Sequence, residues 1–236
     1  MPYIQANDIQ VYYEIHGEGE PLALITGLGS DISEMEWDAI IRSLAQRYQV
    51  IAFDNRGAGR TDKPDQPYTI EMMANDANEL LRALGAERAN ILGVSLGGRI
   101  ALTLAIEHPE RVERLILVST SARLTKRPWW FGPLSLLSSG PFFRSPYPQP
   151  RHAFRWQLQA SSGFNCTDKL GAIHAPTLIL HGRNDKLAPA ALAEEMHNGI
   201  PGSQLRWFTG GHIFFFFRER QQFLEAVEAF LGTQNE

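Results

Sequence analysis

Short apolar segments alternate along the chain with amphipathic ones. Continuous apolar runs rich in β-branched residues predict strands that are buried on both faces, over 21–26, 49–54, 90–94, 114–118 and 177–181. Apolar positions three and four residues apart predict helices over 34–46, 70–84, 96–107, 190–198 and 219–231. This alternation is typical of βαβ units, so the pattern predicts an α/β fold with a mostly parallel sheet.

Two further segments complete the predicted sheet. Residues 9–15 alternate between apolar and polar positions, which predicts an antiparallel strand at the edge of the sheet. Residues 204–208 form a weaker strand pattern just before the last helix.

The longest interruption of this pattern is the segment 121–169. A crossover between parallel strands needs about a dozen residues, and this segment is several times longer. It is rich in proline and aromatic residues, and we interpret it as a cap inserted between two parts of one core, 1–120 and 170–236. Its charged residues are nearly all basic, with Asp168 as the exception: Arg123, Lys126, Arg127, Arg144, Arg151, Arg155 and Lys169. They form either a solvated rim or a surface that selects anionic or interfacial substrates.

Composition narrows the class of protein. The chain has 236 residues, a formal net charge of −4 and a single cysteine, Cys166. This charge argues against nucleic-acid binding, and a lone cysteine forms neither an internal disulfide nor a metal site. The N-terminus has no signal-peptide pattern, and no apolar stretch reaches the roughly 18 residues of a membrane span. We therefore expect a cytoplasmic protein without membrane insertion, nucleic acid, metal or cofactor, and leave its oligomeric state open.

The sequence Gly93-Val-Ser-Leu-Gly97 lies between a predicted strand and a predicted helix. A serine at such a turn has a strained backbone and projects its hydroxyl into a site, provided that the residues two before and two after it are small. The pattern therefore predicts Ser95 as a nucleophile.

Two loops supply candidate partners for this serine. Asp185 follows the strand 177–181, and His212 follows the last strand, in the order Ser, Asp, His. All three lie just past the carboxyl ends of strands, where α/β sheets place their ligands. We predict that His212 is the base for Ser95 and that Asp185 orients it, while the backbone N–H groups of Leu28 and Leu96 form an oxyanion hole.

Several motifs together resemble the α/β-hydrolase superfamily. They are residues 26–29 where the family has H-G-x-G, residues 54–61 where it has D-x-R-G-x-G-x-S, the serine turn, the segment 182–189 and Gly211-His212. The chain is most similar to small carboxylesterases and 3-oxoadipate enol-lactonase-like proteins. The resemblance implies an eight-stranded, mostly parallel sheet with helices on both faces and a short cap insertion. Thr26 replaces the histidine usual in the family, and the cap is shorter than a multi-helix lid.

These residues predict a cofactor-free serine hydrolase that cleaves small-molecule carboxylic esters or lactones through an acyl-enzyme. The residues expected to contact the substrate are Trp129, Trp130, Phe131, Ile213 and Phe214. The same three catalytic groups also suit a C–C bond hydrolase, an amidase or an aminopeptidase, and a receptor that turns over slowly remains a further alternative.

Overall fold

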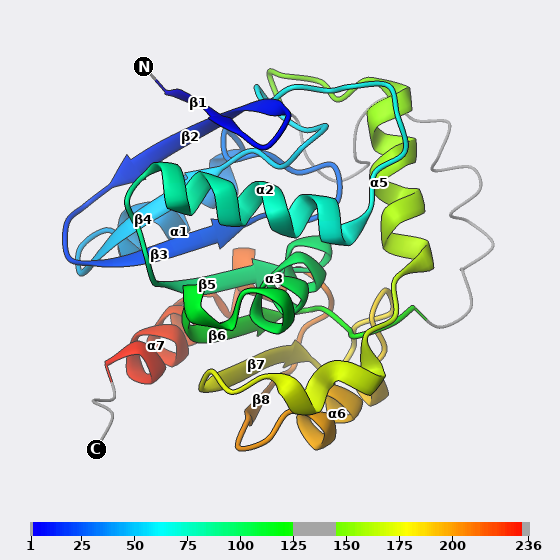
Figure 1. The fold of residues 1–236 in the computed structure, drawn as a ribbon. Coiled ribbons are helices and arrows are strands. Elements are labelled where there is room, and N and C mark those ends of the chain that lie inside the picture. The colour runs from blue at the N-terminus through cyan, green and yellow to red at the C-terminus, as the bar shows by residue number, and fades with distance from the viewer. Residues whose placement is uncertain (1, 125–144, 233–236) are drawn as a thin grey trace.

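The structure is a computed structural model that describes residues 2–124 and 145–232 (Figure 1). These residues form an eight-stranded sheet in the order β1-β2-β4-β3-β5-β6-β7-β8. The strands are β1 Tyr3–Ala6, β2 Ile9–His16, β3 Glu20–Ile25, β4 Tyr48–Phe53, β5 Ala89–Val94, β6 Val112–Val118, β7 Thr177–Gly182 and β8 Gln204–Phe208. β2 pairs antiparallel with β1 and β4. All other neighbours in this order, from β4 through β3 to β8, pair in parallel. The predicted fold class is confirmed.

One prediction about the sheet is wrong. The strand that contains residues 9–15 is not at the edge, because β1 pairs with its outer side in the register Tyr3↔Tyr12 to Ala6↔Ile9. β1 is four residues long and mostly exposed, so it carries too little apolar pattern to be recognised.

Helices cover both faces of the sheet (Figure 1). On one face lie α2 Ile70–Ala83, α3 Leu96–Glu107 and α6 Ala190–Gly199, and on the other lie α1 Met35–Leu44 and α7 Arg220–Leu231. The sequence sets both ends of α2. At its start the side chain of Thr69 accepts a hydrogen bond from Met72 N, and Gly85, at φ +72°, follows its end. The remaining elements are the helix α5 Arg151–Gly163 and the 3-10 turns η1 Pro109–Arg111, η2 Thr167–Ala172 and η3 Phe214–Phe216.

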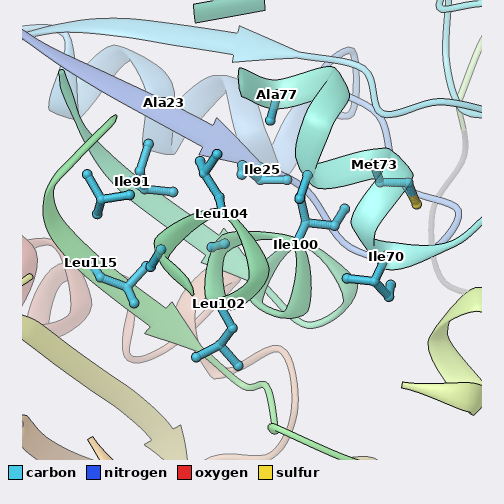
Figure 2. Packing of buried hydrophobic residues seen from close by; sticks show 14 of the residues in the cluster. Ala23, Ile25, Ile70, Met73, Ala77, Ile91, Ile100, Leu102, Leu104 and Leu115 are labelled. Atoms are coloured by element: carbon cyan, nitrogen blue, oxygen red, sulfur yellow. The ribbon is translucent and has the colours of Figure 1, made fainter. Parts of the chain in front are cut away.

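The central strands are buried on both faces, which explains their continuous apolar runs. In β3, Ala23 and Ile25 belong to the core under α2 and α3, whereas Leu22 and Leu24 belong to the core under α1 and α7. Figure 2 shows the first of these cores, where side chains of β3, β5 and β6 meet those of α2 and α3. This packing fixes the ends of the parallel strands, and the loops that follow them carry the candidate site.

Helix α5 lies beyond the end of the sheet toward which the parallel strands point (Figure 1). It belongs to the segment 121–169 and is hydrogen-bonded to the loop after β4, where Trp156 Nε1 donates to Asp65 at 2.8 Å. Across residues 2–124 and 145–232, none of the helices is long and apolar enough to span a bilayer.

Candidate active site

Ser95 occupies a strained turn between β5 and α3. Its φ of 55° and ψ of −112° are rare for a residue with a side chain. Strand and helix approach so closely that a Cβ on Gly93 would lie 2.4 Å from Gly97 O, and a Cβ on Gly97 would lie 2.1 Å from Ile25 O. The turn therefore needs glycine at both positions. The Ser95 amide donates to Val118 O at 2.9 Å, which ties the turn to β6.

The structure brings Ser95, His212 and Asp185 together. Ser95 Oγ lies 2.9 Å from His212 Nε2, and Asp185 Oδ2 lies 2.8 Å from His212 Nδ1. Because an ionised carboxylate can only accept, His212 Nδ1 carries the proton of this bond and Nε2 is left to accept the serine hydroxyl. The ring is thereby oriented to remove a proton from Ser95.

Asp185 is ionised although its side chain is fully buried. Burial alone would raise its pKa, but the hydrogen bond and electrostatic attraction from His212 and the N–H of Ala188 keep the pKa below its ordinary value. Asp185 Oδ1 accepts from the N–H groups of Leu187 at 2.8 Å and Ala188 at 2.9 Å. Its other oxygen is free for His212.

A second histidine supports the loop that carries Asp185, and the sequence interpretation missed it. His181 in β7 is completely buried, and its Nε2 lies 2.8 Å from Ala188 O and 3.6 Å from Asp185 Oδ2. Burial lowers its pKa, so the ring is neutral at neutral pH and Nε2 donates to the carbonyl. The available signal was its place in a buried strand, four residues before Asp185.

The two candidate oxyanion donors lie in two backbone segments that adjoin Ser95. Leu96 is the first residue of α3, so its N–H belongs to a helix N-terminus. Leu28 lies in the turn 27–30, in which Ser30 N donates to Gly27 O at 3.3 Å. A Cβ on Gly27 would lie 3.4 Å from Ser95 Cβ, so this turn packs directly against the serine. Within the part of the chain that the structure describes, neither N–H donates to a protein acceptor.

Thr26 takes the place of the family's histidine and supports the same turn from within. It is fully buried, and its Oγ1 donates to Ser30 O at 3.1 Å. Asn55 Nδ2 donates to Thr26 O at 3.0 Å and approaches Thr26 Oγ1 at 3.3 Å. The turn is therefore tied to the loop after β4 without the histidine.

The predicted substrate contacts are only partly within the described structure. Trp129, Trp130 and Phe131 lie outside it. The ring of Phe214 is 5% exposed and stacks on Phe208 with centroids 4.2 Å apart, while Ile213 is partly buried beside the same core. A contact of these residues with substrate stays a prediction.

The basic residues of the segment 121–169 are partly engaged by the protein itself. Arg123 pairs with Glu195 at 3.0 Å, and the guanidinium of Arg155 lies 4.8 Å from the centre of the Trp156 ring. Lys126, Arg127 and Arg144 lie outside the described residues.

Neither Cys166 nor a metal-binding cluster offers a second site in the described chain. Burial raises the pKa of Cys166 to about 12, so this thiol stays protonated at neutral pH. Among residues 2–124 and 145–232, no cluster of histidine, cysteine, aspartate and glutamate could hold a metal ion.

Comparison with known proteins agrees with this architecture. Residues 20–141 match the family model described as the alpha/beta hydrolase fold. The chain is 32% identical to a protein of Azorhizobium caulinodans named carbamate hydrolase RutD, over 91% of this chain and 92% of that protein. The chain therefore belongs to the α/β-hydrolase family, and it is a hydrolase.

An esterase and a lactone-degrading enzyme are among the solved structures that are similar over nearly the whole chain. The esterase EaEST from Exiguobacterium antarcticum superposes with a TM-score of 0.83 at 28% identity, covering 98% of this chain and 99% of that one. Est816, described as an N-acyl homoserine lactone degrading enzyme, gives a TM-score of 0.84 at 28% identity, covering 97% and 100%.

Proposed function

We propose that the protein is a serine hydrolase that cleaves carboxylic esters or lactones through an acyl-enzyme. The observation that carries the proposal is the continuous hydrogen-bonded chain from Ser95 Oγ through His212 to buried Asp185, at 2.9 Å and 2.8 Å. Such an arrangement activates a hydroxyl that is otherwise a poor nucleophile.

The reaction follows from the positions of these groups. Ser95 Oγ attacks the carbonyl carbon while its proton passes to His212 Nε2, and the N–H groups of Leu28 and Leu96 hydrogen-bond the oxyanion that forms. The tetrahedral intermediate collapses when His212 returns that proton to the leaving alkoxide, which leaves the acyl group on Ser95. His212 then takes a proton from water, whose oxygen attacks the ester. The carboxylic acid leaves and Ser95 regains its proton.

We further propose that residues 121–169 form a cap on a core made of 1–120 and 170–236. Support comes from α5, which lies beyond the carboxyl ends of the parallel strands and is bonded to the loops there. The cap would then supply the substrate contacts of Trp129, Trp130 and Phe131.

Esters and lactones are the substrate class favoured by the names of two of the similar structures, EaEST and Est816. A carbamate is the second candidate, because the relative RutD is named for carbamate hydrolysis. Ser95 can attack the carbonyl of a carbamate in the same way, and the same kind of oxyanion forms. Only experiment therefore separates the two substrate classes.

The first test compares wild type with Ser95→Ala on p-nitrophenyl esters from acetate to palmitate, an N-acyl homoserine lactone and a p-nitrophenyl carbamate. We expect ester turnover that falls on the order of 10⁴-fold or more in Ser95→Ala. The matched control is Ser162→Ala, in α5, whose hydroxyl donates to Gln159 O. Ester turnover that survives Ser95→Ala would refute the assigned nucleophile, and turnover of the carbamate alone would assign the second substrate class.

A further inference from the structure

Gln157 connects α5 to the turn that carries Leu28. Its side chain is fully buried, and both ends of its amide are bonded to backbone groups far away in the sequence. Oε1 accepts from Gly29 N at 3.2 Å, and Nε2 donates to Arg56 O at 2.7 Å. Since an amide N–H can only donate and a carbonyl can only accept, these partners fix the orientation of the side-chain amide.

The bond to Gly29 controls the orientation of the turn 27–30. Gly29 has a φ of +69°, the sign required at the third residue of a type II turn. Type I and type II turns differ by rotation of the central peptide, which here joins the carbonyl of Leu28 to the N–H of Gly29. An acceptor fixed opposite the Gly29 N–H favours the type II orientation and thereby restrains the backbone of Leu28.

The other end of Gln157 is bonded to a rigid part of the molecule. The side chain of Arg56 is fully buried, and its Nε and Nη2 each lie 2.7 Å from a different oxygen of Asp76. This pairing fixes the loop after β4, so Arg56 O is a stationary acceptor. Gln157 therefore transmits the position of that loop to the turn that contains Leu28.

Other residues in and just before α5 also form hydrogen bonds with the loop after β4. His152 Nε2 lies 2.9 Å from Lys63 O, and Gln149 Nε2, just before the helix, donates to Gly57 O at 2.7 Å. These contacts bring the Gln157 amide between two loops that the sequence separates by more than twenty residues. An interface with so many buried polar groups has one well-defined arrangement.

We propose that Gln157 is a positioning residue, which holds the turn 27–30 so that the Leu28 N–H is available to the oxyanion and which makes turnover depend on the docking of α5. This inference rests on the proposed function for the role of Leu28. The contact with Gly29, however, is testable without any substrate.

The kinetic test replaces Gln157 with methionine, which has a similar length but forms neither bond. Because an oxyanion donor acts in the transition state, we expect kcat to fall about 10- to 100-fold, less than the hundred- to thousandfold loss typical when a donor is removed outright. KM should stay within about threefold of the wild-type value. The matched control is Gln159→Met, at an exposed position of the same helix, which should keep the wild-type kcat.

A second variant separates positioning from packing. A protonated glutamate at position 157 can accept from Gly29 N and donate to Arg56 O, whereas its carboxylate cannot donate and places a negative charge near the oxyanion. The ratio of kcat in Gln157→Glu to kcat in wild type should therefore rise as pH falls from 8 to 5. The catalytic base is the same in both proteins, so the ratio isolates the change at position 157. At pH 5, where the carboxyl is protonated, a positioning role predicts a higher kcat for Gln157→Glu than for Gln157→Met, whereas a role in packing alone predicts equal values.

Amide hydrogen exchange of Gly29, measured by NMR, distinguishes failure of this inference from failure of the proposed function. We expect Gly29 to exchange faster in Gln157→Met than in wild type and in Gln159→Met, with the melting temperature checked for each. Unchanged exchange, or a kcat within twofold of wild type, would overturn the inference. A wild type without Ser95-dependent turnover would refute the proposed function, and the exchange measurement would still decide whether Gln157 holds the turn.

Discussion

Glu34 is a buried carboxyl group next to the turn that carries Leu28. Its Oε2 accepts from Ser30 Oγ at 2.6 Å, and the same hydroxyl accepts from Trp37 Nε1 at 2.8 Å. Burial raises the pKa of Glu34 to about 8, and the neighbouring charge of Asp31 adds to the effect, although the bond from Ser30 opposes it. The folded protein therefore binds a proton here at pH values where the unfolded chain has released it.

This difference predicts how the free energy of unfolding depends on pH. The contribution of Glu34 is complete below the unfolded pKa near 4.5 and is lost as pH rises toward 8. In Glu34→Gln that loss is absent, so its stability relative to wild type should increase by at least about 1 kcal/mol between pH 5 and pH 8. Urea unfolding at several pH values measures this difference in the free energy of unfolding. Glu36→Gln, at a partly exposed position, is the control, and parallel curves for wild type and Glu34→Gln would contradict the prediction.

Sequence analysis located individual residues only where a local motif marks them. Ser95 lies in a glycine-flanked turn, and Asp185 and His212 follow strands in a defined order, so their meeting in one site was predictable. Gln157 and Glu34 have no such signal. Their surroundings are created by segments that are distant in sequence, so their contacts exist only once the chain has folded.

At the scale of elements, the turn between β5 and α3 requires glycine at position 97. A methyl group on Gly97 would lie 2.1 Å from Ile25 O and 2.6 Å from Thr26 O, both of them backbone atoms. Gly97→Ala should therefore lower the free energy of unfolding by about 1–3 kcal/mol or more, because strand and helix must separate. It should also lower kcat by displacing Ser95.

Gly163→Ala is the matched control, since a Cβ there meets nothing within 4 Å and the residue lies at the end of α5. This change should be neutral or stabilising by up to about 1 kcal/mol. Urea unfolding of both variants beside wild type gives the comparison. Equal stabilities for Gly97→Ala and Gly163→Ala would show that the turn tolerates a side chain.

The elements that were predicted and those that were missed differ in how they are buried. The central strands and the helices on the sheet carry strong apolar patterns, and their bounds agree with the structure within about two residues. β1 is short and mostly exposed, so its structure depends on pairing with β2. Helix α5 buries Phe154 and Leu158, but no helix was predicted there, because it lies in the proline- and aromatic-rich segment 121–169.

At the scale of the whole molecule, Arg56 joins parts of the chain that are far apart in sequence. Its guanidinium pairs with Asp76 in α2 at 2.7 Å and with Asp8, which lies between β1 and β2. Its carbonyl accepts from Gln157 in α5. Burial raises the pKa of Asp76, so the ionised form of this carboxyl group depends on the guanidinium.

Arg56→Met should therefore lower the free energy of unfolding by about 3–5 kcal/mol at neutral pH, because it leaves the Asp76 carboxylate buried without a counter-ion. The deficit should shrink as pH falls and this carboxyl group is protonated. The double variant Arg56→Met/Asp76→Leu should recover part of the loss, since apolar replacement of a whole buried pair is often nearly neutral. Arg82→Met is the control: Arg82 is an exposed partner of Glu79, so its loss should leave the free energy of unfolding close to the wild-type value. Urea unfolding of the four proteins measures these differences. A deficit independent of pH, with no recovery in the double variant, would assign the role of Arg56 to packing instead of charge.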